Sequence, residues 1–371
     1  FNAPIRNELG ITHGQFGSIY ASATICSSLL LIWIGKKIDE YRLFNYSFFV
    51  IILLFISSLL FSYIDSIAFL FIGIFLIRFS GQGLMSHTSS TAISRYFEKS
   101  RGKSLSISWL GLSTAEFILP VMAIYFLTLF SWKTVWQGIS FLIILILPLL
   151  IFFTIKKINF DSREDNLIIK PKIKIKNWKR KEVLKDYRFY LISLNMLAMP
   201  WIFTGIAVYQ SFITSAKFWN LYTIPKAFMI YSIATITTLS FAGFLVDKFS
   251  SRKLLPLMNL PLLISMLVLI FFNHPLTAYL FLGLIGISNG LANVLGTSTW
   301  AEIYGVKYIG SIKALTTAFM VFSTAFGTAI FGLLIDRGFS VENIAFIAAI
   351  YIVISLSLII IFRKRLEPKK L

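Results

Sequence analysis

Long apolar runs follow one another along nearly the whole chain and are separated by short polar connectors. A helix needs about 20 predominantly apolar residues to cross a hydrocarbon layer of roughly 30 Å, and most of these runs have that length. The pattern therefore predicts an all-α, polytopic membrane protein. We expect eleven spans, at residues 17–34, 44–64, 67–94, 104–128, 134–155, 189–215, 225–246, 254–273, 275–302, 313–335 and 342–362.

The composition agrees with a chain whose main solvent is the bilayer. Of 371 residues, 57% are hydrophobic and 14% are charged, whereas about one-quarter of a soluble domain is charged. The net charge of +19 lies mainly between the spans, so we expect lipid but no nucleic acid as a partner. Cys26 is the only cysteine, so one chain cannot build a disulfide or a cysteine-based metal site. We expect no cofactor.

Basic residues gather in alternate connectors, which is the asymmetry that marks cytoplasmic loops. All but six of the 35 Lys and Arg residues lie in these connectors or after the last span. The exceptions are Arg6, Arg78, Lys133, Lys217, Lys226 and Arg337. The count predicts a cytoplasmic C-terminus and residues 1–16 on the outer side. Together with the abundance of Ile, Lys and Phe, it suggests a bacterial inner-membrane protein.

The chain also repeats itself at an offset of 208 residues. The matched pairs are Gly35 with Gly243, Asp39 with Asp247, Tyr96 with Tyr304, Lys99 with Lys307, and Gly102 with Gly310. Two connectors thus recur in register, which predicts two parallel, pseudo-symmetric helical bundles. We expect an N-terminal bundle at 1–155, a basic cytoplasmic linker at 156–188 and a C-terminal bundle at 189–371.

The start of the chain falls on the wrong side of the membrane for two complete bundles. The same offset places the counterpart of the span at 189–215 about 19 residues before Phe1, and a cytoplasmic N-terminus would require one more span. We therefore expect a parent protein with twelve spans, in two six-helix bundles, from which this chain lacks most of the first helix.

Two connectors share a short motif: a glycine, an aspartate four residues later, and then basic residues. Its members are Gly35, Asp39 and Arg42 in the first half, and Gly243, Asp247 and Arg252 in the second. Both copies resemble the cytoplasmic loop signature of the major facilitator superfamily, at the two places where that family carries it. The resemblance implies a secondary transporter that works by alternating access, with these residues as a conformational gate. The plainer alternative is that they only hold positive charge at the cytoplasmic face.

Arg78 lies near the middle of its span, where a charge costs roughly 3 kcal/mol or more. The run from Arg78 to Gly83 resembles the family's fourth-helix motif, in which paired glycines follow an arginine, and Gln82 shares the helical face of Arg78. Glu116 lies at a similar depth in the next span. The two charges either form an ion pair that only joins two helices, or they couple a proton or an anion to transport.

Two junctions resemble a branch of this superfamily, the monocarboxylate and oxalate/formate porters. They are the stretch from Ser94 to Leu105 and the stretch from Ala301 to Lys313. The resemblance implies a small organic anion as substrate, which Arg78 would bind through its two-pronged donor geometry. The span at 225–246 departs from it, because its centre has no basic residue where monocarboxylate porters carry charge.

A second polar face is expected in the span at 275–302, where it is formed by Asn289, Asn293, Thr297 and Trp300. We interpret this face as lining a cavity; hydrogen bonding between helices is an equally good account. Gly286 and Gly290 have the small-residue spacing that allows helices to pack closely.

Other function classes find less support. The sequence contains no phosphate-binding loop, nucleophile elbow or pair of catalytic carboxylates, so we expect neither an enzyme nor an ATP-driven pump. A receptor or sensor that keeps a transporter fold stays as the alternative. The leading hypothesis is a monomeric symporter or antiporter of a small solute, with protons as a possible coupling ion.

Overall fold

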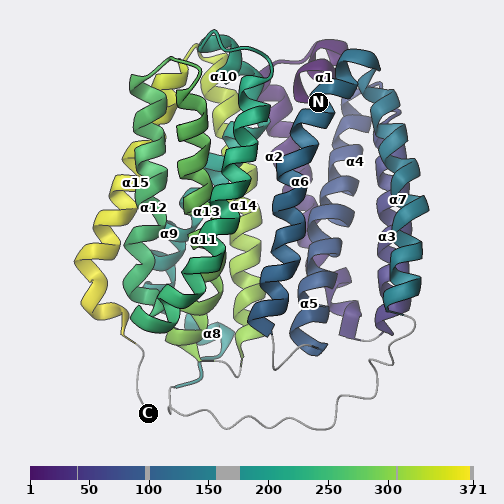
Figure 1. The fold of residues 1–371 in the computed structure, drawn as a ribbon. Helices are drawn as coiled ribbons and strands as arrows, with labels where there is room; N and C mark the ends of the chain where they lie inside the picture. The colour runs from purple at the N-terminus through teal and green to yellow at the C-terminus, as the bar shows by residue number, and fades with distance from the viewer. Residues whose placement is uncertain (40, 97–100, 156–175, 306–307, 368–371) are drawn as a thin grey trace. The chain divides into compact units, whose positions relative to one another are not determined.

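The computed structural model describes the chain except residues 40, 97–100, 156–175, 306–307 and 368–371 (Figure 1). Its regular elements, within the described residues, are all helices. Contacts divide the chain into two compact units. The first unit contains Phe1–Trp109 and Ala123–Lys170, and the second contains Leu110–Met122 and Pro171–Leu371.

The first unit is built from helices that alternate in direction from one predicted span to the next. They are α1 (Asn2–Leu9), α2 (His13–Ile34), the short 3-10 helix η1 (Gly35–Asp39), α3 (Leu43–Phe61), α4 (Ile67–Ile77), the π-helical segment η2 (Arg78–Met85), α5 (Ser86–Tyr96), the ends of α6 (Arg101–Leu129) and α7 (Trp132–Thr154). The middle of α6 groups with the second unit.

The second unit follows the same plan. Its own helices are α8 (Arg180–Val183), α9 (Tyr187–Val208), α10 (Gln210–Ala216), α11 (Thr223–Phe249), α12 (Ser251–Phe271), α13 (Thr277–Tyr304), α14 (Ile309–Asp336), α15 (Val341–Phe362) and η5 (Arg363–Leu366). Each of the eleven predicted spans corresponds to one long helix or to consecutive helical elements, which are α4, η2 and α5 for 67–94 and α9 and α10 for 189–215. In the described residues, ten helical stretches are long and apolar enough to cross a membrane, and the span predicted at 17–34 lies within the 22-residue helix α2.

Hydroxyl side chains define where several helices begin. The Thr12 hydroxyl accepts the backbone N–H of Gln15, whose side chain accepts the N–H of Thr12 in return. Ser131 caps α7 and Ser340 caps α15 in the same way, but without the reciprocal bond from a side chain in the helix. Such caps satisfy N–H groups that have no partner inside the helix, so the turns between spans are fixed locally.

The short helix α1 is held against the start of α7 by one carboxylate. Glu8 accepts hydrogen bonds from Lys133 Nζ at 2.5 Å and from Trp132 Nε1 at 2.6 Å. The bond from Lys133, followed by that from Trp132, holds the pKa of Glu8 below its ordinary value. The start of the chain is thereby attached to the first unit near the ends of its spans.

A break interrupts the predicted span at 189–215. Tyr209 leaves the helical region, with φ −104° and ψ 24°, and separates α9 from α10. Its hydroxyl donates to the backbone oxygen of Thr328 in α14 at 3.1 Å, and its side chain is fully buried. The break therefore has a partner in a neighbouring helix that fixes its geometry.

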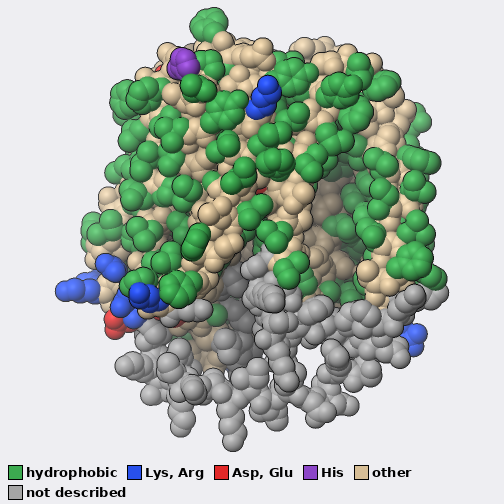
Figure 2. All heavy atoms as spheres, viewed as in Figure 1, with side chains coloured by type: hydrophobic (Ala, Val, Ile, Leu, Met, Phe, Trp, Pro, Cys, Tyr) green, Lys and Arg blue, Asp and Glu red, His purple; other side chains and the backbone are tan. Residues whose placement is uncertain are grey.

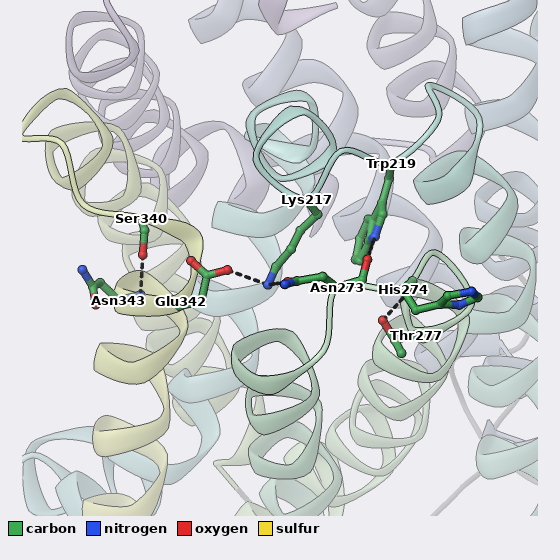
Figure 3. Close-up of polar contacts among 8 residues, drawn as sticks. All are labelled: Lys217, Trp219, Asn273, His274, Thr277, Ser340, Glu342 and Asn343. Carbon is green, nitrogen blue, oxygen red and sulfur yellow. Dashed lines mark hydrogen bonds and ion pairs between the residues drawn. The ribbon is translucent and has the colours of Figure 1, made fainter.

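Lys217, at the end of α10, forms a buried polar cluster with two other helix ends (Figure 3). Its ammonium donates to Asn273 Oδ1 and to Glu342 Oε1, each at 2.6 Å. The backbone oxygen of Asn273 also accepts the indole N–H of Trp219 at 2.6 Å. The side chain of Lys217 is 1% exposed, whereas that of Glu342 is 40% exposed. One buried cation thus joins the ends of α10, α12 and α15.

The cluster predicts an unequal response to removal of its two charges. Glu342→Ala leaves the buried ammonium with Asn273 alone, so we expect the free energy of unfolding to fall by about 3 kcal/mol. Lys217→Met leaves a carboxylate that water can reach, so we expect a loss of about 1 kcal/mol. Unfolding of the purified variants in detergent measures both. A larger loss for Lys217→Met than for Glu342→Ala would contradict this assignment.

Candidate functional site

Arg78 is half-buried in the first unit and is seated by side chains of α2. Its Nε donates to the hydroxyl of Thr24 at 3.2 Å, and its guanidinium carbon lies 5.0 Å from the centre of the Tyr20 ring. Thr24 is fully buried. Tyr20 and Thr24 are four residues apart, so they lie on one face of α2. A hydrogen bond and a cation–π contact together orient the guanidinium.

The helix that carries Arg78 changes its geometry at that residue. From Arg78 to Met85 the backbone is π-helical, and ordinary α-helix precedes and follows it. Single π-helical turns inside α-helices occur frequently at functional sites. Gln82, the polar residue predicted on the same face, lies in this segment with an exposed side chain. The irregular stretch therefore coincides with the polar residues of the span.

Glu116 lies in the part of α6 that groups with the second unit. Its Oε2 atom is buried and has no hydrogen-bond partner among the described residues. Arg78 belongs to the first unit. An ion pair between the two residues stays a prediction.

Asn289 and Tyr231 form a polar pair between α13 and α11. The amide of Asn289 donates to the Tyr231 hydroxyl at 2.8 Å. Tyr231 is fully buried and its ring stacks on Phe203, with the ring centres 5.0 Å apart. Glu116 also acts electrostatically on the Tyr231 hydroxyl. A carboxyl, a phenol and an amide, all in the middle part of helices, thus lie near one another in the second unit.

Two other residues of the predicted asparagine face, Asn293 and Trp300, lie in different environments. Asn293 follows Asn289 by one turn and is partly buried. Trp300 is 2% exposed and packs against Phe189 and Tyr304 in a hydrophobic core. The prediction that Trp300 lines a cavity is therefore wrong, because the helix face turns from the polar region into packed core at that depth.

The close approach of α13 to α11 depends on two glycines, as the small-residue spacing predicted. A Cβ atom at Gly286 would overlap the backbone oxygen of Tyr231, and one at Gly290 would lie 2.7 Å from Cβ of Thr238. The backbone oxygen of Gly286 also accepts the hydroxyl of Thr235 at 3.1 Å. Gly286 therefore brings Asn289 within reach of Tyr231.

The first copy of the predicted gate lies between α2 and α3. Gly35 begins the 3-10 helix η1, and its backbone oxygen lies 3.0 Å from Nε2 of His87 in α5. Arg42 precedes α3 with an exposed side chain. The side chain of Asp39, like that of Asp247 in the second copy, lies outside the described residues. What the structure describes here is the glycine contact with His87.

The second copy contains a network around Glu302, at the end of α13. Arg252 Nε lies 3.0 Å from Glu302 Oε1, and Ser250 and Ser251 donate to the same carboxylate at 2.5 and 2.6 Å. Ser250 has a φ of 74°, which is unfavourable for a residue other than glycine. Its bond to Glu302 offsets part of that strain. Gly243 lies in α11, seven residues or about two turns before Ser250, where an added Cβ would have open space.

Sequence reasoning missed the partners of its own candidates. Tyr20, Thr24 and Tyr231 are ordinary span residues, and nothing local distinguishes them from packing residues. Glu302 lies in the junction from Ala301 to Lys313, and the sequence pattern alone predicts no role for it. A search for residues able to pair with Arg78 at similar depth would have included Tyr20 and Thr24.

Comparison with known proteins gives a family model that matches the chain. The model described as Major Facilitator Superfamily matches residues 1–225 and 219–371. No match is found among curated proteins. The family model thus accounts for the whole length of the chain.

A solved structure shares the fold. It is the crystal structure of a bacterial homolog to the human lysosomal transporter Spinster, in an inward-facing and occupied conformation. The two chains are 16% identical, the TM-score is 0.66, and the alignment covers 98% of this chain and 91% of the other. At this identity the likeness establishes the fold.

Two glycines in α13 provide a matched test of the packing that positions Asn289. Gly286→Ala forces α13 away from α11, so we expect a loss of about 1–3 kcal/mol in the free energy of unfolding. Gly296→Ala, in the same helix, meets no atom within 4 Å and should be neutral or stabilising by up to about 1 kcal/mol. Thermal unfolding of both variants decides the matter. Equal stability of the two would show that the close contact is unimportant.

Proposed function

The chain belongs to the major facilitator superfamily and is a multi-pass membrane transporter; on that premise we propose that it moves a small organic anion by alternating access. Monocarboxylates are the substrate class that the resemblance of its two junctions favours. The coupling is symport with protons or exchange of anions. Arg78 binds the anion, and Glu116 carries the proton.

The observation that carries the proposal is the position of Arg78 in the middle of a span and its contacts with α2. A cation in the middle of a span is expensive, and it is kept only where something compensates it. The hydroxyl of Thr24 and the ring of Tyr20 orient the guanidinium. An anion that reaches this position gains a charge-assisted, geometrically matched partner.

The polar residues of the second unit supply a complementary set. Glu116 has a buried oxygen without a hydrogen-bond partner in the described part of the chain, and it lies near the pair of Tyr231 and Asn289. A carboxyl group that binds and releases a proton changes the charge of its surroundings without a large motion. In this proposal Gln82, Asn289 and Asn293 are neutral hydrogen-bonding groups available to the substrate.

The gate residues act at the ends of the helices in this proposal. Gly35, Asp39 and Arg42 in one half, and Gly243, Asp247 and Arg252 in the other, lie far along the chain from Arg78 and Glu116. Their role is to stabilise one conformation of the cytoplasmic side. They make no contact with substrate.

Substitution of Arg78 tests the anion site. Counterflow of labelled small carboxylates into proteoliposomes should fall at least about tenfold in Arg78→Ala, because a hydrogen bond to a charged group contributes about 1.5–3 kcal/mol. Arg78→Lys should recover part of this loss, since it keeps the charge but not the fork. Normal counterflow in Arg78→Ala would refute the assignment.

Thr24→Val is the graded control for that experiment. It keeps the volume at a buried position and removes only the hydroxyl that accepts the Arg78 Nε–H. We expect a KM several-fold higher with nearly unchanged maximal rate, because the charge remains but its orientation is less fixed.

A substrate-binding signal without flux in the unaltered protein would instead favour a sensor that keeps the transporter fold.

Substitution of Glu116 separates coupling from binding. Glu116→Gln keeps the size and hydrogen-bonding capacity of the side chain but cannot exchange a proton. We expect counterflow, which needs no net proton movement, to persist, and accumulation driven by an imposed pH gradient to disappear. If both persist, the proton is carried elsewhere; if both disappear, Glu116 belongs to the substrate site itself.

A further inference from the structure

A surface at one end of the second unit combines basic and aromatic side chains. It consists of Lys185, Tyr187, Phe362, Arg363, Lys364 and Arg365, which we name the basic–aromatic patch. The four basic side chains are exposed, and Tyr187 is 50% exposed. Lys and Arg side chains gather where α15 ends, at the lower left of the space-filling view (Figure 2). The patch is therefore a concentration of positive charge beside the end of a span.

Direct contacts hold two distant parts of the chain together in this patch. The rings of Tyr187 and Phe362 lie 6.5 Å apart, and the guanidinium carbon of Arg365 lies 5.6 Å from the Phe362 ring centre. The hydroxyl of Tyr190 donates to the backbone oxygen of Leu184 at 2.8 Å, which fixes Lys185 beside the start of α9. The ring of Phe362 thus contacts both a basic side chain of the patch, Arg365, and the ring of Tyr187.

The neighbouring acidic side chains are already engaged. Glu367 pairs with Arg252 at 3.4 Å, and Asp186 pairs with Arg188 at 2.6 Å. Both pairs are internal to the second unit. The positive charge of the patch is therefore not cancelled by these carboxylates.

Exposed apolar surface continues from the patch along α15. Ile360 is 59% exposed and Ile361 is 71% exposed, in a helix apolar enough to cross the membrane. A partner that fits both features has an anionic group and long apolar chains. Soluble anions and nucleic acid offer only the first of these.

We propose that the basic–aromatic patch binds an anionic phospholipid, with its phosphate among the basic side chains and its acyl chains along the exposed side of α15. Guanidinium groups match phosphate oxygens with paired donors. Tyrosine prefers the headgroup level of a membrane, and each basic residue near an anionic surface strengthens binding about fivefold. This inference does not depend on the transported substrate.

The test uses the full chain in nanodiscs of phosphatidylcholine, with or without one-fifth phosphatidylglycerol. Retention of phosphatidylglycerol is measured by native mass spectrometry, and the unfolding midpoint is recorded in both lipids. Arg363→Gln combined with Lys364→Gln should weaken phosphatidylglycerol binding roughly twentyfold and remove the stabilisation that this lipid gives. The matched control combines Lys226→Gln with Arg337→Gln, two exposed basic residues at the opposite end of the same unit.

Three outcomes would overturn the proposal. The first is that the double variant at the patch retains phosphatidylglycerol within twofold of the unaltered protein. The second is that both double variants lose it equally, which would indicate a general effect of bilayer charge. The third is that inorganic phosphate displaces the lipid, which would indicate a site for a free anion. If the patch variant does not fold, a salt titration of the unaltered protein decides, because lipid held by these charges must be released as ionic strength rises.

Discussion

The absence of water from the bilayer is the constraint on which this structure depends. A backbone N–H or C=O without a partner costs several kilocalories per mole in hydrocarbon, so the spans are helices that satisfy their own groups. Hydroxyl side chains inside the spans obey the same rule. Ser57, Thr88 and Ser232 each donate to a backbone oxygen four residues earlier in their own helix. Such residues add polarity without adding an unsatisfied group.

Departures from regular helix occur where another side chain takes over that function. At the break between α9 and α10, the Tyr209 hydroxyl binds a backbone oxygen of α14. The π-helical segment that begins at Arg78 is a second departure, and it carries a charged side chain that donates to the hydroxyl of Thr24. Irregular backbone and intramembrane polarity therefore occur together in this chain.

The sequence allowed the spans to be placed because the bilayer imposes a length that local composition reveals. It allowed Arg78 and Glu116 to be selected because a charge in a span is conspicuous. It did not reveal their surroundings, since which helices are neighbours depends on packing between residues far apart in the chain. Tyr20, Thr24 and Tyr231 were missed for that reason, and Trp300 was misassigned because a regular face does not keep one environment along 28 residues. Lys217 was counted only as an exception to the charge asymmetry, whereas it joins three helix ends.

The contacts of Arg252 limit what the gate can be. A latch that favours one conformation must make contacts in that state which it does not make in the other. The bonds of Arg252 to Glu302 and Glu367 lie within the second unit, so rigid motion of that unit leaves them unchanged. In this arrangement they stiffen the unit, while the Ser250 hydroxyl donates to the same Glu302 carboxylate and holds the strained turn. To act as a latch, Arg252 must change its contact with Glu302, whose carboxylate also accepts the hydroxyls of Ser250 and Ser251 in the turn between α11 and α12. A gate at this position therefore involves the contacts of this short turn and not those of Arg252 alone.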